Sequence, residues 1–175
     1  MKKLFVAIEI PKELKEKIDI ELIEPLGEVK KVPKENLHIT LAYIGEVSEQ
    51  NEKVIVEKLK KIEFSKFPIL LGGTGSFDEK VIWLSAQAIE LFTLAENISR
   101  ELHIDNEFAG HLIIAKAKEG RDITENFKKI RGKKINQTVK VNKFVLLESK
   151  PSIEGSTYHK ITEFKANLSL KNNKK

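Results

Sequence analysis

Two short segments of the chain resemble each other, and each is built around a histidine: residues 37–41 around His38 and residues 110–114 around His111. Their apolar, β-branched composition is typical of β-strands, in which successive side chains point to opposite faces. His38 and Thr40 therefore share one face of the first predicted strand. An imidazole moves a proton near neutral pH and a hydroxyl donates a hydrogen bond, and an anion-handling site needs both functions. Two such strands facing each other across a cleft would place one proton-transfer group on each side of a bound phosphate.

The chain that carries these histidines follows the same plan twice. In the first half the predicted strand, helix and strand cover residues 4–10, 11–24 and 37–44. In the second half they cover residues 81–84, 87–102 and 110–118. Pro11 suits the first turn of a helix, and Leu14, Ile18 and Leu22 follow at four-residue spacing. The repeat predicts two similar lobes related by approximate two-fold symmetry.

The remaining pattern adds strands more than helices. We predict a short strand at 28–32, a helix at 48–62, a strand at 69–71, a small helix at 123–130 and long strands at 138–148 and 157–170. Residues 72–75 (Gly-Gly-Thr-Gly) indicate a flexible connector, since no Lys-Ser/Thr follows as in a phosphate loop. Many strands without a clean strand–helix alternation favour an α+β fold with antiparallel sheets. We expect residues 1–175 to form a single bilobal domain whose lobes are interleaved in sequence.

The composition is that of an ordinary globular protein: 175 residues, 41% hydrophobic and 33% charged. No apolar run approaches the ~18 residues of a membrane span, and Glu9 and Pro11 end the first one too early for a signal core. The absence of cysteine excludes disulfides, thiolate metal sites and cysteine nucleophiles, and we expect a cytoplasmic location. The net charge of +5, mostly from lysine, is compatible with a nucleic-acid partner.

Several segments together resemble a known family. They are residues 4–8 (Leu-Phe-Val-Ala-Ile), 36–46 around His38, 108–116 around His111, and 144–149 followed by Gly155 and Tyr158. In this order they resemble the two-histidine (2H) phosphoesterase superfamily, in particular its RNA 2′,3′-cyclic phosphodiesterase branch, also called the 2′-5′ RNA ligase family. The resemblance spans nearly the whole chain, and the first His-x-Thr-x motif with its flanks is quite specific. It implies a bilobal α+β fold with two pseudo-symmetric antiparallel sheets lining a central cleft and helices packed outside.

The resemblance also implies an activity. It is the metal-independent opening of a 2′,3′-cyclic phosphate on RNA, which leaves a 2′-phosphomonoester, and some relatives also run the reverse chemistry and join 2′-5′ linkages. The implied partner is an RNA end carrying a cyclic phosphate, tRNA fragments included, with no cofactor, no metal and no membrane, and we expect a monomer. By the same analogy His111 accepts the proton of the attacking water, His38 donates a proton to the leaving 3′-oxygen, and Thr40 binds a non-bridging phosphate oxygen.

The second motif departs from the family pattern. Where a threonine or serine is expected the chain has Ile113, which cannot donate a hydrogen bond. Lys116, Lys118 or a backbone N–H could replace the missing donor, or the protein is slow, altered in substrate or no longer catalytic. Two alternatives therefore stay open: a non-catalytic RNA- or nucleotide-binding module on the same fold, and a phosphodiesterase acting on a small cyclic nucleotide.

Other polar and aromatic residues have simpler interpretations. His103 ends a predicted helix and His159 lies in a predicted strand, so we expect structural roles for both. The aromatic residues Phe77, Trp83 and Tyr158 could stack on bases, although core packing is the favoured role for each. Seven lysines could form a basic rim, although a solvated surface is the favoured interpretation for each: Lys30, Lys31, Lys34, Lys116, Lys118, Lys143 and Lys150. Neither histidine motif holds the additional Asp, Glu or His of a usual metal site.

Overall fold

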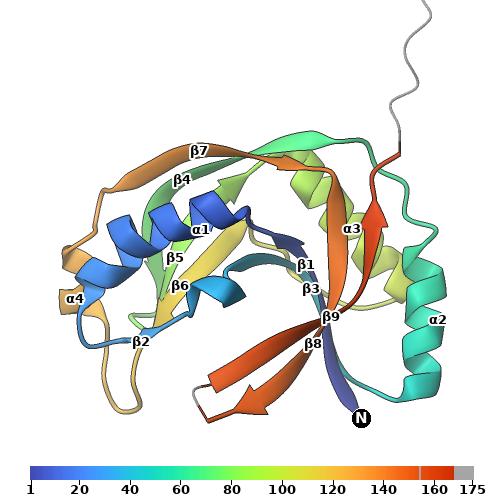
Figure 1. Ribbon diagram of the computed structural model, residues 1–175, viewed down its shortest axis with the longest axis horizontal. Coiled ribbons are helices and arrows are strands. Elements are labelled where there is room, and N and C mark those ends of the chain that lie inside the picture. Colours follow the sequence, from blue (N-terminus) through green and yellow to red (C-terminus); the bar gives the residue numbers. More distant parts are fainter. Residues whose placement is uncertain (154, 168–175) are drawn as a thin grey trace, which may run out of the picture.

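The computed structural model describes residues 1–153 and 155–167, and within them nine β-strands form one antiparallel sheet (Figure 1). The strands are β1 (Lys2–Glu9), β2 (Lys30–Lys31), β3 (His38–Val47), β4 (Phe67–Phe77), β5 (Val81–Gln87), β6 (His111–Lys116), β7 (Lys134–Val141), β8 (Lys143–Ser152) and β9 (Gly155–Lys165). The α-helices are α1 (Lys12–Ile18), α2 (Glu49–Leu59), α3 (Ile89–Leu102) and α4 (Thr124–Lys128). Along the sheet the strands follow the order β7-β4-β5-β6-β3-β1-β8-β9, and β2 pairs with β6.

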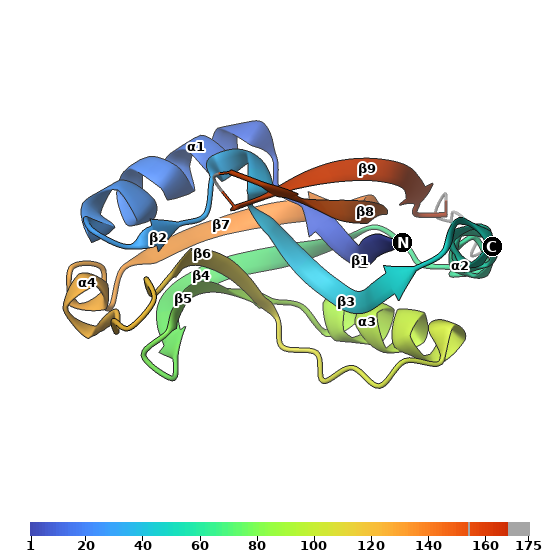
Figure 2. The ribbon, with the colours of Figure 1, turned by 90° about the horizontal axis from the view of Figure 1, so that it is seen from below.

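The sheet consists of two equivalent halves. The order β3-β1-β8-β9 in one half corresponds to β6-β5-β4-β7 in the other, and the connections β1–α1–β3 and β5–α3–β6 correspond as well. One residue pair, Ile39 opposite Leu112, joins the halves between β3 and β6. The α+β fold and the internal repeat are therefore confirmed, and the two expected sheets are the halves of one strongly curved sheet. In Figure 2 this sheet runs between α1 on one side and α3 on the other.

The alternation of side chains gives β1 and β8 two apolar faces. Leu4, Val6 and Ile8 belong to the main core, which also receives the inner faces of α1 and α3. The intervening Phe5 and Ala7 pack in a smaller cluster with Val145 and Leu147 of β8, and Tyr158 of β9 packs against it; these three strands are neighbours in the sheet. The smaller cluster is on the face of the sheet that carries His38, because Phe5 contacts the ring of that histidine. Apolar side chains therefore pack beside the His38 ring on this face of the sheet.

The prediction of a flexible connector at residues 72–75 is wrong, because these residues lie inside β4. A Cβ on Gly75 would lie 2.2 Å from the indole ring of Trp83, and one on Gly72 would lie 2.7 Å from the hydroxyl of Ser85. The glycines therefore let side chains of β5 lie across the backbone of β4. They serve close packing within the sheet rather than chain flexibility.

Other boundaries also differ from the sequence prediction. The single strand predicted over 138–148 is wrong: Asn142 separates β7 from β8, which lie in different halves of the sheet. The helix predicted over 11–24 is α-helical only to Ile18 and continues as a π-helical turn, Asp19–Ile23. Strand β9 ends at Lys165, and residues 168–170 of the predicted last strand lie outside the described residues.

The helix predicted at residue 48 is confirmed as α2, whose N-terminus is capped by the Ser48 hydroxyl. No helix of the described ranges has the length and apolar character needed to cross a membrane.

Candidate functional site

The junction between the two halves of the sheet positions both histidines. Ile39 and Leu112 form the joining pair, and both side chains are fully buried in the core. Their neighbours along β3 and β6 consequently point to the other face of the sheet. There His38, Thr40, His111 and Ile113 line one cavity of about 160 Å³ together with Val32, Lys116 and Tyr158. The structure thus brings both predicted motifs to a single cavity.

His38 is held at both ring nitrogens. Its Nδ1 lies 2.6 Å from the backbone oxygen of Asn36, and its Nε2 lies 2.9 Å from the hydroxyl of Thr40. A carbonyl can only accept, so Nδ1 carries the proton and, in the neutral ring, Nε2 accepts a hydrogen bond from Thr40. The rings of Phe5 and Tyr158 contact the imidazole, with centroids at 5.1 and 5.2 Å. The orientation and the tautomer of His38 are therefore fixed by its surroundings.

The same surroundings favour the neutral form of His38. Burial lowers the pKa of this imidazole below its ordinary value, and the positive charges of Lys15 and Lys116 and the ring of His111 act in the same direction. The hydrogen bond to the Asn36 backbone oxygen opposes them in part. At neutral pH, Nε2 is consequently a hydrogen-bond acceptor.

His111 is held in a similar way in the other half of the sheet. Its Nδ1 lies 2.6 Å from the backbone oxygen of Ala109, so each histidine bonds the carbonyl two residues before it. The ring of Phe77 meets the imidazole edge-on at 5.3 Å. Gly110 is required here because a Cβ would lie 2.2 Å from the backbone oxygen of Ala86 in the adjacent strand. Among the described residues, Nε2 of His111 has no protein hydrogen-bond partner and is free to meet a ligand.

The structure separates the two lysines that could replace a hydroxyl at position 113. Lys116 lines the cavity beside Ile113. The ammonium group of Lys118 instead forms an ion pair of 2.6 Å with Glu28 and is not among the residues lining the cavity. Lys116 is therefore the cation that is available to an anion between the two histidines.

A second cavity of about 120 Å³ adjoins the first. The two share Val32, Lys116 and Tyr158 as lining residues. The second cavity is also lined by Lys30, Lys31, Pro33, Asn36, Gly155 and Ser156. Four of the seven lysines proposed for a basic rim form ion pairs with carboxylates: Lys34, Lys118, Lys143 and Lys150. The other three line this second cavity, and none of them forms an ion pair within the described ranges.

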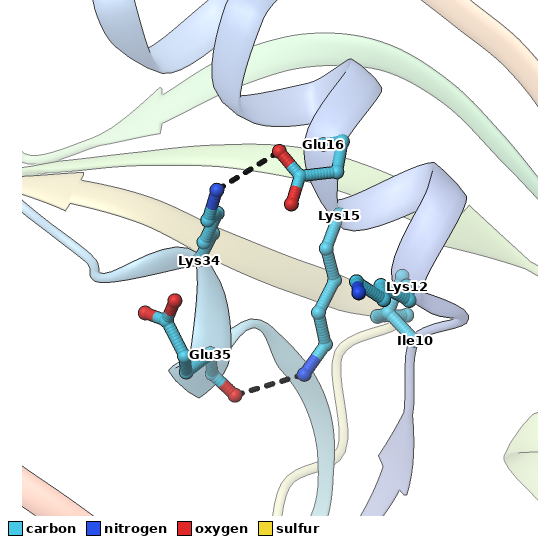
Figure 3. A pocket seen from close by; sticks show the side chains of 6 residues that line it. All are labelled: Ile10, Lys12, Lys15, Glu16, Lys34 and Glu35. Atoms are coloured by element: carbon cyan, nitrogen blue, oxygen red, sulfur yellow. Dashed lines mark hydrogen bonds and ion pairs between the residues drawn. The ribbon is translucent and has the colours of Figure 1, made fainter.

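Sequence reasoning missed the contacts that hold the turn before His38. From α1, Lys15 donates a 2.8 Å hydrogen bond to the backbone oxygen of Glu35, and Glu16 forms a 2.9 Å ion pair with Lys34 (Figure 3). The Asn36 amide donates a 2.7 Å hydrogen bond to the backbone oxygen of Ser156 in β9. These partners lie 18 to 120 residues apart in the chain, and no local pattern signals such contacts.

The other residues considered from the sequence lie in different environments. Tyr158 lines both cavities, and Phe77 is 40% exposed beside His111. Trp83 is not among the lining residues and packs against Phe77. His103 caps the C-terminus of α3 in a left-handed conformation, and His159 is exposed on β9. Among the described residues, no three His, Asp or Glu side chains converge into a metal-binding group.

A curved antiparallel sheet that presents one histidine from each half to a shared cavity defines the two-histidine phosphoesterase class. Comparison with known proteins agrees: the family model described as "LigT like Phosphoesterase" matches residues 8–83. The RNA 2′,3′-cyclic phosphodiesterase of Archaeoglobus fulgidus is 30% identical over 93% of this chain and 99% of its own length. The enzyme of that name from Aeropyrum pernix is 33% identical over 79% of this chain and 86% of its own length.

Solved structures show the same fold. Escherichia coli LigT complexed with phosphate superimposes with a TM-score of 0.79 and is 25% identical, covering 95% of this chain and 98% of that protein. Its complex with 3′-AMP gives a TM-score of 0.78 at 25% identity, covering 95% and 99%. The chain belongs to the LigT-like phosphoesterase family.

Proposed function

We propose that this protein hydrolyses the 2′,3′-cyclic phosphate at the end of an RNA strand to a 2′-phosphomonoester. The observation that carries the proposal is the placement of His38 and His111 on one phosphate-sized cavity. Relatives that align with 93% and 79% of the chain are RNA 2′,3′-cyclic phosphodiesterases, which supports the same reaction. The cavity is lined by residues from both halves of the sheet, so we infer that residues 1–175 act as a single bilobal unit, and we propose that this unit functions as a monomer.

The reaction needs a base on one side of the phosphorus and an acid on the other. Water attacks in line with the leaving 3′-oxygen, so one group accepts a proton while another donates one. We assign the base to His111, whose Nε2 has no partner among the described residues. We assign the acid to His38, which protonates the 3′-oxygen as its bond to phosphorus breaks. Each positioned proton transfer typically accelerates the reaction by ~10²–10⁴.

The acid must first acquire its proton at Nε2. In the free site that nitrogen accepts from Thr40, and burial lowers the pKa of His38. A bound phosphate diester brings a negative charge close to the ring, which raises the pKa again. We infer that the Thr40 hydroxyl then turns from Nε2 to a non-bridging phosphate oxygen, and that the released Nε2 takes up a proton from the solvent.

Charge on the non-bridging oxygens is stabilised from two sides in this proposal. Thr40 donates its hydroxyl hydrogen from β3, and Lys116 supplies an ammonium group from β6 in place of a hydroxyl at position 113. The structure of LigT complexed with phosphate indicates that a protein of this fold accepts such an anion. Ile113 remains the observation that favours the second candidate, a non-catalytic module that binds RNA or nucleotides in the same cavity.

The test is to incubate the protein, without added metal, with an oligoribonucleotide that ends in a 2′,3′-cyclic phosphate. We expect a product with a 2′-phosphate, and we expect His38→Ala and His111→Ala each to lose at least about a hundredfold in kcat while their circular dichroism remains native. His159→Ala is the matched control, because this exposed histidine lies outside the cavity. Binding without turnover would support the second candidate. A 3′-phosphate product would contradict the proposed reaction, because the 2′-oxygen rather than the 3′-oxygen would then have left.

A further inference from the structure

We propose that the second cavity, lined by Lys30 and Lys116, binds the phosphate on the 5′-oxygen of the terminal nucleotide. The proposal rests on the proposed function, because it takes the cyclic phosphate to occupy the cavity between the histidines. It names the part of the substrate that distinguishes an RNA end from a bare cyclic mononucleoside phosphate. The first support is that the two cavities share a wall formed by Val32, Lys116 and Tyr158.

The charge arrangement points to an anion. Lys30 of β2 stands directly opposite Lys116 of β6 in their antiparallel ladder. Like charges at directly opposed positions of neighbouring strands repel each other and destabilise the pairing. Neither lysine forms an ion pair with a carboxylate among the described residues, and no acidic residue lines the cavity. A phosphate between the two ammonium groups would remove this repulsion.

The volume of the second cavity fits a small group. At about 120 Å³ the second cavity is far smaller than the roughly 300–1,000 Å³ of sites that take whole small molecules. A cavity of this volume accommodates one phosphate group. The catalytic cavity, at about 160 Å³, is similar in size. Two adjacent phosphate-sized cavities that share one lysine match two successive phosphates of one strand.

The covalent structure of an RNA end supports the same assignment of its phosphates to the two cavities. A cyclic phosphate bridges the 2′- and 3′-oxygens of the terminal ribose, and the preceding phosphate is attached to the 5′-oxygen of that ribose. The ribose would then lie over the shared wall, where Val32 and Tyr158 provide apolar contact area. Asn36 connects the two places, since its backbone oxygen holds His38 and its side-chain amide holds Ser156 at the rim of the second cavity.

The proposal applies alike to the phosphate of an RNA chain and to a terminal 5′-monophosphate, and three substrates test it. They are a nucleoside 2′,3′-cyclic phosphate, the same compound with a 5′-phosphate, and a dinucleotide with the same cyclic end. We expect kcat/KM for the second and third substrates to exceed that for the first by about tenfold or more, as for one charge-assisted contact. A plot of log kcat/KM against log salt concentration should have a steeper negative slope for the dinucleotide than for the nucleoside 2′,3′-cyclic phosphate. The two slopes should differ by roughly 0.7, as expected for one additional phosphate contact.

Substitutions test the residues directly. Lys30→Met retains most of the side-chain length and removes the charge. We expect this variant to reduce about tenfold the ratio of kcat/KM for the dinucleotide to kcat/KM for the nucleoside 2′,3′-cyclic phosphate that lacks a 5′-phosphate. Lys118→Met is the matched control, because Lys118 is paired with Glu28 and lines neither cavity. A preference for the dinucleotide that the 5′-phosphorylated mononucleotide does not share would overturn the proposal, since the gain would then come from the added nucleoside. Equal turnover of all three substrates would overturn it too while leaving the proposed function intact, whereas turnover of none would contradict the proposed function itself.

Discussion

Replacing Ile113 by threonine would restore a hydroxyl to the half of the site that lacks one. The joining pair, Ile39 opposite Leu112, places position 113 across from His38, just as Thr40 lies across from His111. Ile113 already lines the catalytic cavity, so a hydroxyl on its Cβ would face the same anion as Thr40. We therefore predict that Ile113→Thr hydrolyses the cyclic phosphate faster than the natural protein.

The magnitude follows from one added donor to a charged acceptor. Such a hydrogen bond contributes about 1.5–3 kcal/mol, which corresponds to about ten- to hundredfold in rate. Removing a comparable donor from other enzymes lowers the rate by ~10²–10³. We expect a gain of only about ten- to hundredfold for Ile113→Thr, because Lys116 already provides positive charge in the cavity. Ile113 belongs to neither apolar cluster, so the substitution should reduce the free energy of unfolding by only about 1 kcal/mol.

The assay compares kcat of three proteins on one oligonucleotide with a cyclic phosphate end: the natural protein, Ile113→Thr and Ile113→Val. Valine has the shape of threonine without the hydroxyl, so it isolates the effect of the donor from that of the smaller side chain. We expect the threonine variant alone to be faster, with similar melting temperatures for both variants. Equal rates for the threonine and valine variants, with both folded, would refute the reasoning and show that the site already satisfies the phosphate by other means.

Three further predictions concern the imidazole, the backbone and metal. In NMR titrations of the free protein, His38 should titrate below its ordinary pKa, and its pKa should rise on addition of inorganic phosphate and in Lys15→Met, since an anion is gained or a nearby cation is lost; an unchanged pKa in both cases would contradict the electrostatic argument. Gly110→Ala should lower the free energy of unfolding by about 2 kcal/mol, measured by denaturant titration, because the new methyl group would overlap the backbone oxygen of Ala86; an unchanged midpoint would show that β6 can shift freely. Turnover should persist in excess EDTA, and a loss of activity that Mg²⁺ or Mn²⁺ restores would contradict metal-independent catalysis.

Local alternation explains why the site could be predicted from the sequence. In β3 and β6 each histidine alternates with buried aliphatic residues, and this pattern fixes which side chains share a face. The strand–helix–strand repeat then predicts that both motifs occupy equivalent places, as they do on either side of the Ile39–Leu112 pair. Both features follow from residues close together in the chain. The functional roles of His38 and His111 remain proposals.

The errors arose where packing between strands or a change of phase decides the structure. A glycine run has no side chain that signals what lies above it, and only the position of Trp83 against Gly75 shows why the run is a strand. Between β7 and β8 the core-facing residues change from odd positions, such as Val141, to even positions, such as Phe144. That change of phase at Asn142 was a readable signal for a break. The contacts of Lys15 and Asn36 have no comparable local signal.

The two-fold repeat by itself would produce two equivalent imidazoles, whereas the proposed reaction needs one that accepts a proton and one that donates it. Both rings are held by the carbonyl two residues earlier, so their orientation does not distinguish them. Their surroundings do: His38 is packed between aromatic rings and bonded to Thr40, and the field of Lys116 acts against its protonation. A phosphate that contacts Lys116 would offset this field and engage Thr40, so the same binding event would remove two obstacles to protonating Nε2. Substrate binding would thus favour the charged form of the acid, and the asymmetry of the site would come from the neighbours of the histidines rather than from their backbone.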